Sequence, residues 1–137
     1  MLKRIDHIAI VVHDLDAALN TYRDTLGLCV THVEELPAEQ VKVAFLPMPD
    51  GFSEIELVQP IDTESGVARF LAKRGEGMHH ICFAVDDIQS AMGQLAAEGM
   101  QLLETQPRLG SHGQKYVFVH PRSAHGVLIE LYEAPAP

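Results

Sequence analysis

The chain has 137 residues, of which 47% are hydrophobic, and its formal net charge is −9 at pH 7. This length fits one compact domain, or two small halves that share a core. The acidic balance argues against a nucleic-acid surface, which needs clustered lysine and arginine. No apolar run approaches the roughly 20 residues that span a bilayer, and the first residues lack the cleavage region of a signal peptide. We therefore expect a cytoplasmic protein with no nucleic-acid or membrane partner.

The first half of the chain predicts a strand, a helix and three more strands. A strand over 6–12 leads into a helix whose apolar residues recur at i, i+3, i+4 and i+7 across 15–26. Asp14 can cap the free N–H groups at the start of this helix, and Gly27 is suited to end it. The next strands are expected at 29–34, 41–46 and 53–60. Residues 63–74 predict a short helix that links the two halves.

The second half of the chain repeats the first. At an offset of 73 residues His80 matches His7 and Asp87 matches Asp14, and an "IEL" strand recurs at an offset of 74. The elements expected in this half are a strand over 79–85, a helix over 88–95 with Gly99 at its end, and strands over 101–105, 116–120 and 127–132.

The repeat predicts an α+β fold built from two tandem βαβββ modules. Repeat 1 covers about 4–60, the linking helix about 62–75 and repeat 2 about 77–134. Because each half is too small for a secure core, we expect the two to pack as one pseudo-twofold domain over 1–137.

Strand alternation places one histidine and one glutamate of each half at matching positions. Neighbouring side chains of a strand point to opposite sides, so His7 and His80 share equivalent faces, whereas His79 lies on the core side and has a structural role. Glu56 and Glu130 are single carboxylates in strands that otherwise look buried, and a buried carboxylate needs a partner. Two imidazoles and two carboxylates suit an octahedral divalent ion such as Co²⁺, Ni²⁺, Mn²⁺, Fe²⁺ or Zn²⁺, with two positions left for water or substrate. Taken alone, each residue is also explained by a structural hydrogen bond or a salt bridge.

These features resemble the vicinal oxygen chelate superfamily, which includes glyoxalase I, extradiol dioxygenases and methylmalonyl-CoA epimerases. The stretches "IDHIAIVV", "AEQVKVAFLP", "SEIELVQP", "FLAKRGEGMHHICFAVDDI", "GSHGQKYVFVHP" and "GVLIEL" are similar to the methylmalonyl-CoA epimerase family over almost the whole chain. The resemblance implies a cupped sheet around one metal ion held by His7, His80 and Glu130, with Glu56 where the family carries Gln or Glu as the fourth ligand. It also implies Co²⁺ as the first choice of metal, with Ni²⁺, Mn²⁺ or Zn²⁺ as alternatives, an acyl-CoA thioester substrate and a homodimer.

The reaction that this resemblance implies is metal-dependent epimerisation of (2R)- and (2S)-methylmalonyl-CoA. The α-proton would be removed and returned through a metal-stabilised enolate, with Glu130 as the base on one face. Some members of the family carry a second glutamate on the strand over 41–46, and alignment places Ala44 at that position. Glu56 is therefore the preferred second base.

Substrate contacts are expected from residues outside the ligand set. Lys42 lies on the strand over 41–46, and His112 belongs to a glycine-flanked loop that could close over a ligand, with a plain turn as the alternative. Lys115, together with Arg108 and Arg122, is a candidate for contacts with the CoA phosphates.

Three other functions stay open from the sequence alone. A glyoxalase I-like isomerase (lactoylglutathione lyase) uses the same ligand set and also moves a proton between neighbouring carbons. A metal-free protein that binds a small molecule on this scaffold usually lacks the full ligand set. A ring-cleaving dioxygenase needs an open iron site, which two carboxylates would crowd.

Overall fold

The computed structural model describes residues 1–135 and contains two compact units. One unit is His7–His79, and the other combines residues 1–6 with the chain from His80 onward. The boundaries fall inside two strands, β1 (Leu2–Val11) and β5 (Gly77–Val85). Among the described residues, no helix is both long and apolar enough to cross a membrane.

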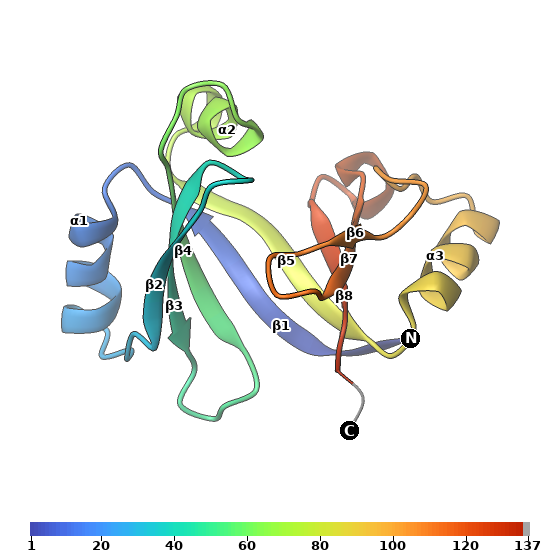
Figure 1. The fold of residues 1–137 in the computed structure, drawn as a ribbon, viewed down its shortest axis with the longest axis horizontal. Helices are drawn as coiled ribbons and strands as arrows, with labels where there is room; N and C mark the ends of the chain where they lie inside the picture. Colours follow the sequence, from blue (N-terminus) through green and yellow to red (C-terminus); the bar gives the residue numbers. More distant parts are fainter. Residues whose placement is uncertain (136–137) are drawn as a thin grey trace. The chain divides into compact units, whose positions relative to one another are not determined.

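The His7–His79 unit corresponds to the first of the two predicted modules. Its strands lie in the order β2-β3-β4-β1 (Figure 1, blue to green). β1 and β4 run parallel, and the other two pairs are antiparallel. The strands other than β1 are β2 (His32–Leu36), β3 (Val41–Pro47) and β4 (Glu54–Pro60). The predicted strand over 29–34 therefore begins three residues later than expected.

One helix covers one face of this half-sheet. α1 spans Leu15–Leu19 and continues as a π-helical turn over Asn20–Thr25, so the predicted helix over 15–26 is present with a wider second half. The Asp14 carboxylate accepts hydrogen bonds from two backbone N–H groups of the first turn, and Gly27 has a positive φ of 85° after the last turn. Both predicted end signals are confirmed.

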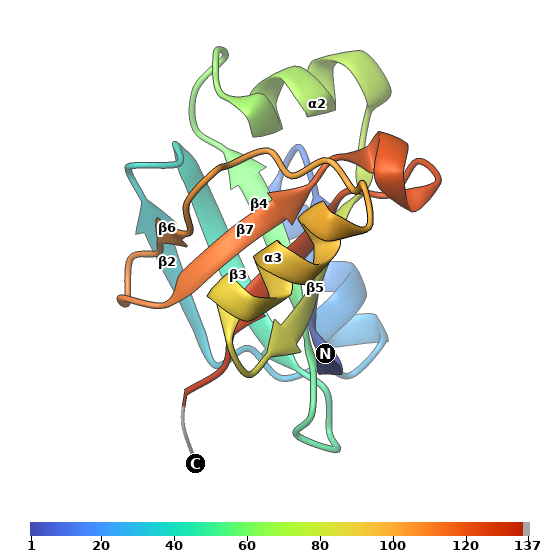
Figure 2. The same cartoon turned by 90° about the vertical axis from the view of Figure 1, so that its right-hand side faces the viewer.

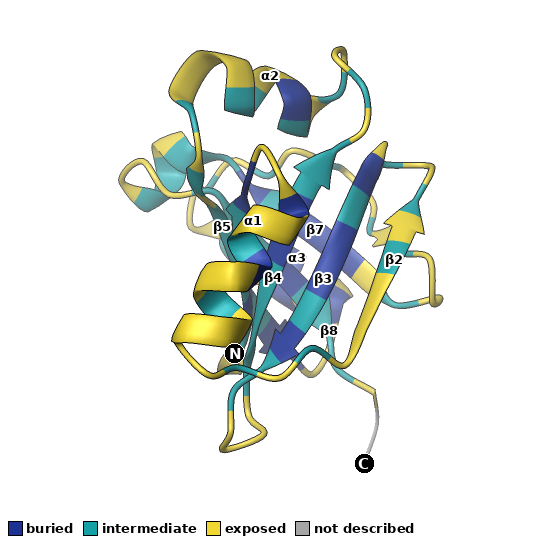
Figure 3. Cartoon of the chain, turned by 90° about the vertical axis from the view of Figure 1, so that its left-hand side faces the viewer, coloured by how far each residue is buried: buried dark blue, intermediate teal, exposed yellow. Residues whose placement is uncertain are grey.

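The two faces of β3 and β4 bury different sets of apolar side chains. Leu46 and Leu57 pack against α1, whereas Val43 and Val58 form a second cluster on the opposite face. Figure 3 shows β3 buried or half-buried along its length while the outer side of α1 is exposed. α2 (Gly66–Arg74) contributes to the second cluster, and it begins three residues later than the sequence predicts because the Ser65 side chain caps it.

The second unit repeats this plan with the strand order β5-β8-β7-β6. α3 (Ile88–Ala97) is capped by Asp87 and packs on Val117 of β7 and Leu131 of β8. Figure 2 shows α3 in front of the strands of this unit. The strands that follow α3 are β6 (Arg108–Leu109), β7 (Lys115–Val119) and β8 (Ile129–Glu133), with a short 3-10 helix over Pro121–Ala124 before β8.

The predicted strand over 101–105 is wrong. Leu102 makes only an isolated bridge to Val119, and the outer neighbour of β7 is the two-residue strand β6. The reason is visible at Glu104, whose side-chain oxygen accepts the Phe118 N–H at 2.8 Å. A carboxylate therefore replaces the backbone carbonyl that a strand at this place would have supplied.

Each unit contains an equivalent hydrogen bond that sequence analysis missed. In one, the Gln59 side-chain oxygen accepts the Leu15 N–H at 2.7 Å; in the other, a Glu133 carboxylate oxygen accepts the Ile88 N–H at 2.9 Å. Each bond joins the last strand of a module to the first turn of its helix and satisfies an otherwise unpaired donor. The α+β class and the two βαβββ modules are thus confirmed, and the single-domain organisation stays a prediction.

Candidate functional site

In the His7–His79 unit, a histidine of β1 meets a glutamate of β4. β1 and β4 are parallel neighbours with Ala9 opposite Glu56, so His7 and Glu56 leave adjacent strands on the same face. His7 Nδ1 lies 3.0 Å from Glu56 Oε2. The face is the one that carries the Val58 cluster, away from α1. His7 and Glu56, two of the four predicted ligands, therefore lie side by side in this unit.

The second unit holds an equivalent pair. β5 and β8 are parallel neighbours with Cys82 opposite Glu130, and His80 Nε2 lies 3.0 Å from Glu130 Oε1. The His80 ring also lies edge-on to Phe118, with 5.5 Å between the ring centres.

The two pairs have the same composition, separation and exposure. The side chains are 11% and 16% exposed at His7 and Glu56, and 13% and 14% exposed at His80 and Glu130. They differ in the ring nitrogen used, Nδ1 in the first pair and Nε2 in the second. Two neighbouring ligands of an octahedral ion with bonds of about 2.1 Å are about 3.0 Å apart. The distance within each pair therefore fits two ligands of the same ion. The same spacing suits a hydrogen bond from an imidazole N–H to a carboxylate.

His79 lies apart from these contacts. Its ring is edge-on to Phe70 of α2, with 5.0 Å between the ring centres, and both residues belong to the His7–His79 unit. Strand alternation thus separates the two adjacent histidines of β5 as expected, since His80 is the one that meets a carboxylate.

β3 carries no carboxylate on the face of Glu56. Ala44 is fully buried in the cluster beneath α1, so the alignment that placed the second family glutamate there is corrected. The side chains that share the Glu56 face are its strand neighbour Phe45 and, two residues earlier, Val43. Lys42 alternates with Val43 and therefore lies on the α1 side, away from Glu56.

The other predicted substrate contacts lie at the turn between β6 and β7. His112 and Lys115 are both exposed there. The turn is tightly built, because the Gln114 side-chain oxygen accepts the His112 N–H at 3.0 Å and the Gln114 amide occupies the space that a Cβ at Gly110 would need. A turn at His112 is confirmed, whereas closure over a ligand stays a prediction.

Sequence analysis missed the aromatic side chains beside the two glutamates. Phe45 lies opposite Glu56 on β3, and Phe118 lies opposite Glu130 on β7. The two phenylalanines match at the same offset of 73 that relates the histidines, so the repeat held the signal needed to find them.

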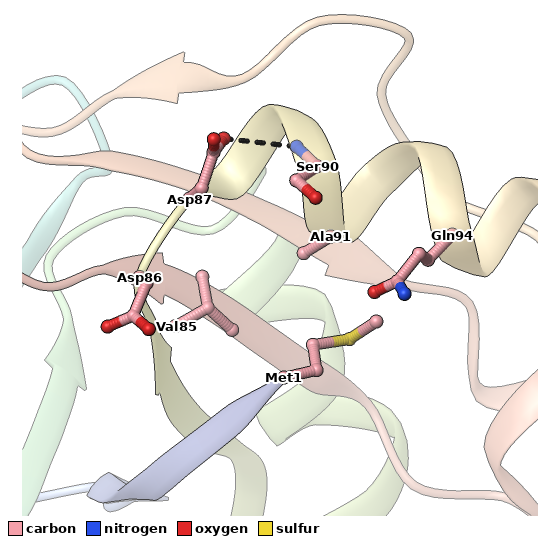
Figure 4. A pocket seen from close by; sticks show the side chains of 7 residues that line it. All are labelled: Met1, Val85, Asp86, Asp87, Ser90, Ala91 and Gln94. Atoms are coloured by element: carbon pink, nitrogen blue, oxygen red, sulfur yellow. Dashed lines mark hydrogen bonds between the residues drawn. The ribbon is translucent and has the colours of Figure 1, made fainter.

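A small pocket at the start of α3 holds none of these residues (Figure 4). It lies between Met1 and α3 and includes two aspartates that already have partners. Asp87 accepts the Ser90 N–H at 3.1 Å, and Asp86 forms an ion pair with Lys3 at 3.0 Å. We assign no function to it.

The family model for the Glyoxalase/Bleomycin resistance protein/Dioxygenase superfamily matches residues 6–118. The chain belongs to this superfamily. Within it, an ethylmalonyl-CoA/methylmalonyl-CoA epimerase of Cereibacter sphaeroides is 40% identical over 96% of this chain and 98% of that protein. The mitochondrial methylmalonyl-CoA epimerase of Mus musculus is 38% identical over 97% of this chain and 74% of that protein.

A solved structure of a methylmalonyl-CoA epimerase in complex with methylmalonyl-CoA and NH₄⁺ has the same fold. It is 41% identical, its TM-score is 0.88, and the match covers 99% of this chain and 97% of that one. The chain is therefore a member of the methylmalonyl-CoA epimerase family, an isomerase family, and the predicted fold and family are confirmed.

Proposed function

We propose that the protein interconverts (2R)- and (2S)-methylmalonyl-CoA by removing and returning the α-proton. The observation that carries this proposal is the matched pair of His7 with Glu56 and His80 with Glu130, each at 3.0 Å. A reaction that moves a proton between two faces of a planar carbon needs two acid–base groups, and a repeat supplies two equivalent carboxylates. Membership of the epimerase family supports the same reaction.

We propose that His7, Glu56, His80 and Glu130 hold one divalent metal ion, with Co²⁺ as the first choice. The two imidazole and two carboxylate donors suit such an ion, and the donor spacing within each pair is that of neighbouring ligands. When bound, a divalent ion would supply a positive charge that stabilises negative charge on the substrate oxygens.

The protein's own contribution is to orient the two carboxylates and transfer the proton. Each glutamate lies 3.0 Å from the histidine of its own half, and a phenylalanine stands opposite it on the neighbouring strand. Glu130 then accepts the α-proton on one face of the substrate, and Glu56 returns a proton on the other. The thioester carbonyl takes up the negative charge left at the α-carbon, and a bound cation at the substrate oxygens would stabilise that charge further.

The remaining expectations have different degrees of support. His112 and Lys115 lie on the unit that holds Glu130, at a turn from which they could contact an acyl-CoA ligand. Lys42 has no such support, because it lies on the opposite face of β3 from Glu56. A single domain, a homodimer and a cytoplasmic location stay predictions.

The test is deuterium exchange at the α-carbon of methylmalonyl-CoA in D₂O. We expect protein loaded with Co²⁺ to incorporate deuterium and to invert the centre, and we expect a chelator to stop both. Glu35→Gln is the matched control, because Glu35 lies opposite Lys42 and so on the other face of the half-sheet from Glu56. Turnover of methylglyoxal with glutathione, without exchange of the CoA ester, would replace the epimerase proposal with a glyoxalase I-like one.

A further inference from the structure

A continuous row of ring contacts leads from His80 to an arginine at the edge of its half-sheet. The His80 and Phe118 rings are 5.5 Å apart at 88°, and the Phe118 and Tyr116 rings are 5.9 Å apart at 87°. The guanidinium carbon of Arg108 then lies 5.5 Å from the centre of the Tyr116 ring. The row lies on the face of Glu130, because Phe118 is the strand neighbour of Glu130.

The position of Arg108 is fixed by its surroundings while its charge stays accessible. Arg108 lies opposite Tyr116 in the β6–β7 ladder, so its stem crosses the face beside that ring. Glu104 is 18% exposed and is held by the Phe118 N–H, and its second oxygen is 4.0 Å from the guanidinium. The Arg108 side chain is 54% exposed. A contact of 4.0 Å at an exposed site is a weak ion pair, so the guanidinium can take a second anionic partner.

The equivalent row in the His7–His79 unit has the opposite charge. Glu34 lies opposite Val43 in the β2–β3 ladder, and Arg108 lies opposite Tyr116 in the β6–β7 ladder. Glu34 therefore has the position in its unit that Arg108 has in the other. Glu34 is accompanied by His32, 3.8 Å away, whose ring stacks on Phe45 at 4.3 Å. The repeat therefore has a cation at one outer strand and a carboxylate at the other.

Building on the proposed epimerase function, we propose that Arg108 binds a phosphate group of the CoA moiety. The CoA arm of the substrate then lies along the His80–Phe118–Tyr116 row toward β6, and not toward β2. A guanidinium matches phosphate oxygens with two parallel hydrogen bonds, and the Arg108 side chain, 5.5 Å from the centre of the Tyr116 ring, is 54% exposed. Coenzyme A carries several negative charges and the chain has a net charge of −9, so a phosphate needs a local cation. Glu34 would repel the same group.

Two ligand pairs separate phosphate binding from other roles of Arg108. Binding of free coenzyme A and of pantetheine, which lacks the phosphates, is measured by calorimetry on the wild type and on Arg108→Gln. We expect the Kd of coenzyme A to rise about tenfold or more in the variant, the loss of one charged hydrogen-bonded contact, and the Kd of pantetheine to stay unchanged. Arg108→Lys, which keeps the charge but loses the forked geometry, should give an intermediate Kd.

Turnover of the corresponding thioesters gives the second readout. Arg108→Gln should raise the KM for methylmalonyl-CoA by a similar factor with little change in kcat, and should leave the KM for the pantetheine thioester unchanged. Lys3→Gln is the control, because it removes an exposed cation that pairs with Asp86 elsewhere in the same unit. Equal coenzyme A affinity in the wild type and Arg108→Gln, or equal losses for both ligands, overturns the proposal. A wild type that binds coenzyme A through Arg108 but exchanges no α-proton refutes the epimerase function alone.

Discussion

Replacing Glu130 by glutamine removes a base while keeping the shape of the side chain. In the wild type His80 Nε2 lies 3.0 Å from Glu130 Oε1. The amide oxygen of glutamine can face the same nitrogen, so the histidine keeps its orientation. A positioned general base contributes about 10²–10⁴-fold to a rate, which is about 2.7–5.5 kcal/mol in the activation free energy. We expect Glu130→Gln to slow epimerisation by a factor in this range.

The assay starts from each pure epimer of methylmalonyl-CoA in D₂O and follows both α-deuteration and inversion by NMR. In Glu130→Gln, Glu56 is the remaining base. It can still exchange the α-proton of the epimer whose α-proton faces Glu56, so this epimer should gain deuterium without inverting. Glu56→Gln should show the same behaviour with the other epimer. Metal content is measured in each variant, so that loss of a ligand is distinguished from loss of a base.

Two results would refute this reasoning. Inversion by Glu130→Gln at the wild-type rate would show that the carboxylate is not a base. Equal loss of exchange from both epimers, with full metal content, would show that the two faces are not served by different glutamates.

Three further predictions concern the scaffold that positions the pairs. Leu57→Ala should lower the free energy of unfolding by about 2–5 kcal/mol in urea titrations, because Leu57 is fully buried beneath α1, whereas the exposed Val33→Ala should change it by less than about 0.5 kcal/mol. Glu133→Ala should cost about 1–3 kcal/mol by the same measurement, since it leaves the Ile88 N–H without its acceptor, and an unchanged stability would contradict this role. Gly110→Ala should lower the Tm, because an added Cβ at Gly110 displaces the Gln114 amide that accepts the His112 N–H.

The sequence was sufficient to place the site residues that occur at matching positions in both halves of the repeat. His7 with Glu56 and His80 with Glu130 could be paired from strand alternation and one offset, since the fold keeps the same register in both halves. Ala44 could not be placed this way, because β3 has apolar side chains on both faces and its one polar residue, Lys42, lies on the α1 side. Only the ladder to Leu57 shows that it faces α1.

Other features depended on tertiary contacts that no local pattern carries. The strand over 101–105 looked regular, but the Glu104 side chain accepts the Phe118 N–H in place of a backbone carbonyl of this segment. The π-helical turn over Asn20–Thr25 follows the same apolar spacing as an α-helix. Arg108 was one of several scattered cations in the sequence, and only its contact with Tyr116 places it on the face of Glu130.

The central claim is that one His–Glu pair from each half of the repeat contributes to a single metal site. It is tested most directly by the Co²⁺ stoichiometry of the wild type, His7→Ala and His80→Ala, measured by elemental analysis after dialysis. We expect one ion per chain in the wild type and a loss of bound metal in both variants, because each half supplies ligands to the same ion. Two ions per chain in the wild type, or one retained ion in either variant, would contradict the account.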